Sequence, residues 1–169
     1  MKHFIIAIIL LIILGGGGYY AYAEFYKQPA ERHIHAGFLV FIDGKQQDFS
    51  SVRFMSLEPC DEHTGRKSKE ELAHEMAHLH DSVGYIGHSH REGAVWGDLF
   101  RNIGYTFDTS KPLTAYVNGK KVDDIFSYLV NAYDSLVILV GNSDKKLVSK
   151  AITKEQIVKA EQTSADCGK

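Results

Sequence analysis

Alternating apolar and polar positions mark the first strand that the sequence predicts. Residues 33–42 (HIHAGFLVFI) alternate in this way and are rich in β-forming side chains. They end at Asp43-Gly44, a dipeptide typical of tight hairpin turns. We therefore expect a return strand over residues 46–49 and another short strand over residues 52–57.

The pattern then changes from strand-like to helix-like. Ser68, followed three residues later by Glu71, forms a capping-box sequence and predicts a helix over residues 69–77. Residues 83–90 carry two glycines and are interpreted as a short strand or hairpin. The apolar positions of residues 96–103 have the spacing of one helix face, so a second helix is expected there.

A second hairpin and a buried strand follow. Residues 113–117 are predicted to form a strand that ends at the hairpin turn Asn118-Gly119. Residues 123–129 begin with two aspartates, which favour a helix N-terminus, and predict a short helix. The continuous apolar run of residues 135–140 (SLVILV) predicts a central strand.

This order of elements predicts an α+β fold, specifically a β-grasp (ubiquitin-like) roll with a histidine-rich insertion at residues 52–95. From the N-terminus we expect a transmembrane anchor or signal segment at residues 1–23, a linker at 24–32, the domain at 33–142 and a polar C-terminal tail at 143–169. A helix over residues 154–160 is compatible with the tail, but we do not expect the tail to be core. The expected core side chains are Phe38, Val40, Ile42, Trp96, Leu99, Phe100 and Ile103.

The N-terminal segment predicts a location outside the cytoplasm. Residues 4–23 are about as long as the roughly 20 residues that a helix needs to span a bilayer. In the anchor interpretation, which we favour, Lys2 stays inside and tyrosines lie at the outer interface. In the alternative, a cleavable signal, residues 21–23 (AYA) form the small-x-small site. Either interpretation gives a domain outside the cell membrane, attached to it by a single span in the first case.

Composition argues against nucleic-acid partners and leaves three interpretations of the two cysteines. The net charge is -2 and no basic stripe is interleaved with aromatic residues, so nucleic-acid binding is not expected. Cys60 and Cys167 permit one disulfide in an oxidising compartment. Alternatively they are two unrelated thiols, or Cys60 is a metal ligand near His63.

Three His-x-His pairs give the strongest chemical signal. In an extended backbone alternate side chains share a face, so each pair presents two imidazoles in one direction. Pairs brought close together make a nitrogen site suited to copper or zinc. The predicted metal ligands are a subset of His33, His35, His78, His80, His88 and His90. Asp81 is expected to serve as an oxygen ligand or to orient an imidazole.

The number and identity of the ions stay open. Six imidazoles exceed the four ligands of one tetrahedral zinc, so either two ions bind or some pairs are outer partners. An all-histidine site suits Cu(II) and Zn(II) equally, and with 3 methionines a thioether-based Cu(I) carrier is not expected. Because ligation requires neutral imidazoles, binding should weaken as the pH falls below about 6.5.

A competing motif overlaps the second pair. Residues 74–78 spell HEMAH, and on a continuous helix His74 and His78 would bind zinc while Glu75 acts as general base. Residues two apart on a helix point in nearly opposite directions, so His78 and His80 cannot chelate together there. One conformation cannot satisfy both patterns. We favour the extended pair, which requires the helix to stop by about Ala77.

The order of these motifs resembles a family. The strings HIHAGFLVFIDGKQQDFS, HLHD, IGHSH with WGDLFRNIG, YVNGKKVDDIFSYLV and DSLVILVGN are similar to a group of uncharacterised membrane-anchored proteins from archaea and candidate-phylum bacteria. The resemblance covers roughly residues 33–142. It implies the domain architecture and marks the His-x-His pairs, and it brings no established activity. Some members carry a disulfide-isomerase label, for which this chain lacks a CxxC motif.

Three functional hypotheses follow. The first is a membrane-anchored metal-binding domain that captures or delivers copper or zinc, or that serves a membrane complex. The second is a small zinc hydrolase that uses His74, Glu75 and His78. The third is a protein-interaction module that recruits an unknown partner through a sheet edge or the anchor, with incidental or pH-sensing histidines.

Overall fold

The computed structural model describes residues 12–22, 31–56 and 68–163. The chain divides into two compact units, residues 1–30 and 31–169, which are described separately. In the first unit, residues 12–22 form a helix with exposed isoleucine, leucine and tyrosine side chains. Within the described residues, no helix has both the length and the apolar character needed to cross a bilayer. The predicted anchor lies partly outside those residues.

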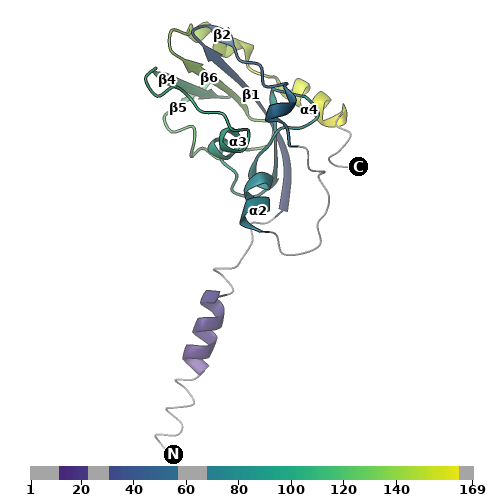
Figure 1. Cartoon of the computed structure of the whole chain (residues 1–169), viewed down its shortest axis with the longest axis vertical. Helices are drawn as coiled ribbons and strands as arrows, with labels where there is room; N and C mark the ends of the chain where they lie inside the picture. Colours follow the sequence, from purple (N-terminus) through teal and green to yellow (C-terminus); the bar gives the residue numbers. More distant parts are fainter. Residues whose placement is uncertain (1–11, 23–30, 57–67, 164–169) are drawn as a thin grey trace, which may run out of the picture. The chain divides into compact units, whose positions relative to one another are not determined.

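The second unit is an α+β domain built on a six-stranded sheet (Figure 1). The strands are β1 Glu31–Ile42, β2 Lys45–Gln46, β3 Ile86–Arg91, β4 Leu113–Val117, β5 Lys120–Val122 and β6 Ser135–Val140. Five of them run in the order β2-β1-β6-β4-β5, and β3 pairs with β1 outside that path. β1 and β6 are parallel, and all other pairs are antiparallel. The predicted α+β class is therefore confirmed.

β1 serves two parts of the sheet along its length. Its C-terminal half, from Gly37 to Ile42, pairs with all of β6. Its N-terminal half pairs with β3, with partners from Glu31 to Gly37 and a bulge between Glu31 and Ile34. One strand thus connects the body of the sheet with a two-stranded extension, and the first His-x-His pair lies on that extension.

Each face of the sheet carries its own apolar cluster. The predicted core residues Phe38 and Val40 point to one face, where they pack with α3 (Trp96–Asn102). Leu39 and Phe41 point to the other face, where they pack with the C-terminal segment. This alternation is the one expected of an extended strand.

The C-terminal segment is part of the core, so the expectation for the tail was wrong. It comprises the 3-10 helix η2 (Lys145–Lys150) and α4 (Lys154–Thr163). Ile152 and Ile157 are buried in the second cluster. A Cβ on Gly37 would lie 2.6 Å from the Cβ of Ile152, so the missing side chain lets the segment pack directly on β1.

Two predicted helices are present with the expected signals. α2 spans Lys69–Met76, and Ser68 and Glu71 form both hydrogen bonds of the capping box. α3 covers most of the predicted 96–103 segment, and Gly104 follows it with a φ of +65°.

Three local predictions were wrong. The return strand is limited to Lys45–Gln46. Val52–Phe54 is a 3-10 helix (η1) rather than a strand. Residues 123–129 form turns, because the carbonyls of Phe126 and Tyr128 accept hydrogen bonds from the first N–H groups of α3 at 3.0 and 3.1 Å. Those carbonyls satisfy the start of α3 from outside the helix.

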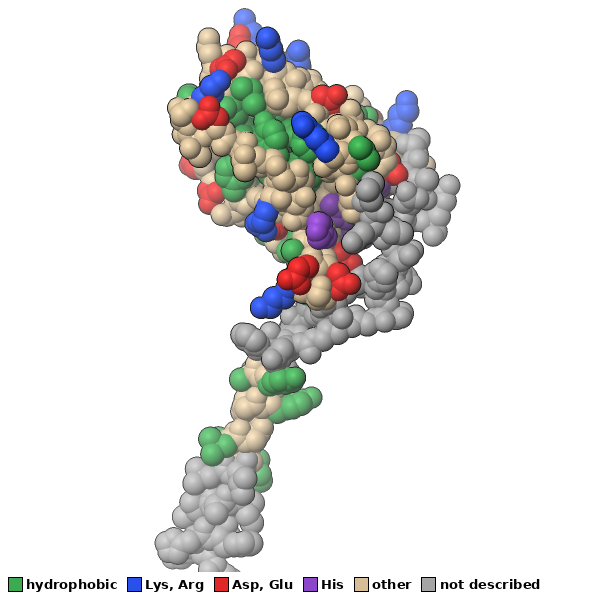
Figure 2. All heavy atoms as spheres, in the orientation of Figure 1, with side chains coloured by type: hydrophobic (Ala, Val, Ile, Leu, Met, Phe, Trp, Pro, Cys, Tyr) green, Lys and Arg blue, Asp and Glu red, His purple; other side chains and the backbone are tan. Residues whose placement is uncertain are grey.

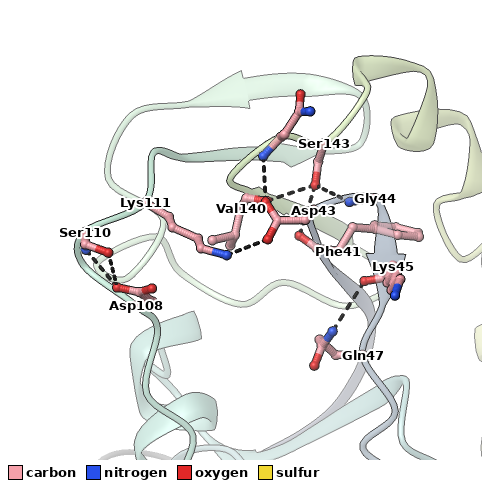
Figure 3. Close-up of polar contacts among 11 residues, drawn as sticks. Phe41, Asp43, Gly44, Lys45, Gln47, Asp108, Ser110, Lys111, Val140 and Ser143 are labelled. Carbon is pink, nitrogen blue, oxygen red and sulfur yellow. Dashed lines mark hydrogen bonds and ion pairs between the residues drawn. The ribbon is translucent and has the colours of Figure 1, made fainter.

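The hairpin end of β1 is tied to the end of β6 by a polar network (Figure 3). The Asp43 carboxylate accepts hydrogen bonds from Lys111 and, at 2.9 Å, from the backbone N–H of Asn142. The Ser143 hydroxyl accepts from the Gly44 N–H at 3.0 Å and donates to the Val140 carbonyl at 2.9 Å. This network holds the turn against the neighbouring strand.

Candidate metal centre

The three His-x-His pairs come from three adjacent extended segments. β1 and β3 place His35 directly opposite His88. His78 lies on the other side of His88, because the two residues exchange backbone hydrogen bonds of 2.9 Å in each direction. β3 is therefore central, and one row of the extension reads His35, His88, His78. His33 and His90 extend the cluster beyond this row.

All six predicted histidines meet in one cluster of rings. The ring centroids lie 4.7 Å apart for His33–His35 and for His33–His90, 4.2 Å for His35–His88, 3.5 Å for His80–His88, 5.1 Å for His78–His90 and 5.8 Å for His78–His80. Four of the side chains are buried, His90 is half-buried and His33 is exposed. Histidine atoms also reach the surface of the domain, where they are purple in Figure 2.

The residue between each pair of histidines explains why the rings share a face. Ile34 and Leu79 are buried in the cluster that packs with α3, so their histidine neighbours point to the opposite side. Ser89 is fully buried, and its hydroxyl donates to the Arg91 carbonyl at 3.0 Å. The apolar pattern thus fixes the direction of the imidazoles.

The overlapping HEMAH motif does not form a helical chelate. α2 ends at Met76, and Ala77 is extended, with φ −163° and ψ 137°. The predicted stop by about Ala77 is confirmed. His74 remains on the exposed side of the helix, and Glu75 accepts a 2.6 Å hydrogen bond from Arg91. The continuous helix that the zinc-hydrolase hypothesis requires is therefore absent from this described segment.

Oxygen atoms contact the Nδ1 atoms of three imidazoles. His78 Nδ1 lies 3.0 Å from the His74 carbonyl, and His80 Nδ1 lies 2.5 Å from a carboxylate oxygen of Asp81. His35 Nδ1 lies 3.2 Å from Glu161 Oε1, at ion-pair distance but outside hydrogen-bond geometry. An oxygen at Nδ1 favours the tautomer that leaves Nε2 available as a metal ligand.

Burial keeps most of these imidazoles neutral. Desolvation is the largest cause that lowers the pKa of His78 to about 4 and that of His90 to about 3. Desolvation also lowers the pKa of His33, His35 and His88, with neighbouring imidazoles adding to the effect. Neutral imidazole is the form that binds a metal ion.

A compact set of ligand atoms lies at the β1–β3 pair. One ring nitrogen from each of His33, His35 and His88 lies within 4.8 Å of the other two. His35 Nε2 is buried and has no hydrogen-bond partner among the described residues. Three imidazole ligands leave one position open on a four-coordinate ion. The donor set therefore fits Zn(II) or Cu(II).

Two residues beside this set were not predicted. Glu161 comes from α4, and its second carboxylate oxygen accepts from the Tyr133 hydroxyl at 3.3 Å. Tyr133 also donates its N–H to the His35 carbonyl at 2.8 Å and has a left-handed φ of +64°, which is uncommon for an aromatic residue. Glu161 lies one helical turn after the buried Ile157 on α4, but no sequence signal identified its contact with His35.

Some predictions lie outside the described residues. These are the Cys60–Cys167 disulfide and the alternative of Cys60 and His63 as ligands. Comparisons with protein-family models, with curated proteins and with solved structures found no match for this chain.

Proposed function

We propose that this chain binds Cu(II) or Zn(II) outside the cytoplasm and captures the metal or delivers it to a partner in the membrane. The carrying observation is that six histidines from three extended segments meet in one largely buried cluster. Burying a polar group without a hydrogen bond costs about 1–3 kcal/mol. A metal ion offsets that cost by taking the nitrogen lone pairs.

The primary site in this proposal consists of His33, His35 and His88. Their ligand atoms are mutually close, and His33 is exposed, which gives an ion a route from solvent. Glu161 would hold the His35 ring in its ligating orientation, as outer carboxylates do at many metal–histidine sites. An open coordination position suits transfer of the ion to another ligand set.

The proposal extends to the fold and the anchor. Two hairpins joined through the parallel pair β1 and β6, with α3 packed on one face, are the features expected of a β-grasp roll. Residues 52–95 would then be the insertion, which supplies four of the six histidines. Residues 4–23 would anchor the chain in the cell membrane.

The test is elemental analysis of the full chain, purified in detergent without a histidine tag. We expect about one or more equivalents of copper or zinc, and fewer equivalents in a His33→Ala/His35→Ala variant. A His74→Ala variant is the matched control, because that ring is exposed on α2. Absence of metal, even after loading with Cu(II) and Zn(II), would contradict the proposal and favour the interaction-module hypothesis.

A further inference from the structure

We propose that the cluster holds two metal ions and that the imidazole of His88 is shared between them. The first ion takes the His33, His35 and His88 site. The second lies between His80 and His88, with His78 beside it. This inference rests on the proposed metal-binding function and deepens it, because it assigns a role to histidines that the first site does not use.

The position of His88 supports a shared ring. On one side it lies 4.2 Å from the ring of His35, and on the other side 3.5 Å from the ring of His80, in both cases between centroids. His80 Nε2 lies 2.8 Å from His88 Nδ1. The Nδ1 atom of His88 therefore faces His80, which leaves its Nε2 atom for the first site.

Three histidines of the cluster are not ligands of the first ion, and three are more than are needed to orient its ligands. One four-coordinate ion that uses three imidazoles leaves His78, His80 and His90 without a metal. His78 and His80 are buried, and each has an oxygen against Nδ1, so each directs Nε2 away from that oxygen. Such an arrangement is the one that ligating histidines adopt with their outer partners.

The distance between the two nitrogens favours Cu(II) at the second site. With metal–nitrogen bonds of about 2.0 Å, nitrogens separated by 2.8 Å subtend an angle of about 90° at the ion. That angle fits the tetragonal geometry of Cu(II) better than the tetrahedral geometry of zinc. Cu(II) is therefore the probe for the second site.

The proton is accounted for in this arrangement, and part of the positive charge of the two ions is offset. The hydrogen bond between His80 and His88 holds one proton, and the second ion takes its place. His88 then binds through both nitrogens as imidazolate, and the proton leaves to solvent. Asp81 and Glu161 add negative charge at the two sides of the cluster. The charge of Arg91 is balanced by Glu75.

The experiment titrates the full chain in detergent with Cu(II) and follows stoichiometry and the electron paramagnetic resonance signal. All samples carry His3→Ala, which removes a histidine near the N-terminus that lies outside the described residues. Loosely held copper is removed by desalting before each count. His80→Ala tests the second site, His33→Ala tests the first, and His74→Ala is the control.

We expect two equivalents of copper, with the resonance intensity per copper falling as the second equivalent binds, because spins that share an imidazolate couple. His80→Ala should keep one equivalent with full intensity, and His74→Ala should keep two. Saturation at one equivalent would overturn the two-ion site and leave the proposed function standing. Two equivalents with undiminished intensity would overturn the shared ring. Absence of copper would overturn the two-ion site, and absence of both copper and zinc after loading would overturn the proposed function as well. If His80→Ala fails to fold, the stoichiometry and the resonance intensity of the protein with all six cluster histidines still test the two-ion site.

Discussion

The two ends of β1 handle polar groups in opposite ways. At the hairpin end, Asp43, Lys111 and Ser143 pair with one another or with backbone groups at the surface (Figure 3). At the other end, neutral imidazoles gather in the interior, and His35 Nε2 has no hydrogen-bond partner in the described part of the chain. Both ends lie on the same strand, but the hairpin end pairs with β2 and β6 and the other end pairs with β3.

The contrast separates a structural network from a site prepared for a ligand. In the hairpin network, Asp43, Lys111 and Ser143 each have hydrogen-bond partners within the protein. The histidine cluster leaves the buried His35 Nε2 without a hydrogen-bond partner in the described part of the chain, which is unfavourable unless a ligand binds it. The following predictions test whether the two ends respond differently to the same kinds of change.

The largest effect is expected on metal affinity. His35→Ala/His88→Ala should weaken Cu(II) or Zn(II) binding by more than about 100-fold, which is beyond the roughly 10–100-fold effect of losing an outer partner. Asp43→Asn, at the hairpin end, should leave the affinity unchanged. Competition with a chelator of known affinity measures both. Equal losses of metal affinity in the two variants would contradict the proposed difference between the metal site and the hairpin network.

Acid should act on the histidine end first. The pKa of His78 is about 4 in the folded chain and about 6.5 when unfolded, so between these values the unfolded state binds the additional proton. Stability of the metal-free protein is therefore complete above pH 6.5 and falls as the pH drops, by about 3 kcal/mol near pH 4 from this residue.

Denaturant unfolding of metal-free protein at several pH values measures this loss. The hairpin end is not expected to contribute over that range, because hydrogen bonds from Lys111 and Asn142 lower the pKa of Asp43 below its ordinary value. Its contribution is lost only as the pH falls below that value. Stability that stays flat from pH 6.5 to 4 would contradict the assignment of a neutral, buried His78.

Replacing the outer carboxylate should have an intermediate effect. Glu161→Gln keeps the size of the side chain but weakens its interaction with His35 Nδ1, so metal affinity should fall about 10-fold with little change in stability. Tyr133→Phe removes only the hydroxyl contact to Glu161, so this substitution should lower the metal affinity by less than Glu161→Gln does. Isothermal titration of the two variants makes the comparison. An effect of Tyr133→Phe larger than that of Glu161→Gln would point to packing instead.

The smallest effect is expected from the exposed ion pair. Lys111→Met removes the partner of Asp43 and should lower the free energy of unfolding only slightly, because solvent screens an exposed ion pair. Metal affinity should not change. Thermal unfolding with and without metal provides the measurement. A large loss of stability would show that the domain depends on this network for its folding.

Local sequence signals predicted much of the fold. The alternation of residues 33–42 located β1 and its two faces, and Ser68 with Glu71 located the start of α2. Interactions between distant segments caused the errors. Residues 123–129 have helix-favouring aspartates, but their carbonyls bind the start of α3 instead.

The candidate site shows the same division. The spacing of the histidines predicted that each His-x-His pair shares one face. It could not show that β3 lies between β1 and His78, because local spacing does not determine which strands lie side by side. Glu161 belongs to a helix in a polar segment, and the packing of Ile152 and Ile157 on the sheet brings it to His35. The composition of the candidate site therefore depends on packing between segments that are distant in the sequence, which local patterns do not predict.

The shared alternation of β1 also limits how this chain can change by insertion or deletion. One residue added between His35 and Phe38 would turn the histidines toward α3 and their apolar neighbours toward the cluster, because strand faces repeat every two residues. Two added residues would restore the faces but move His35 out of line with His88. Homologous lineages that keep the site should therefore vary in length outside β1 and preserve the distance from the histidines to the hairpin.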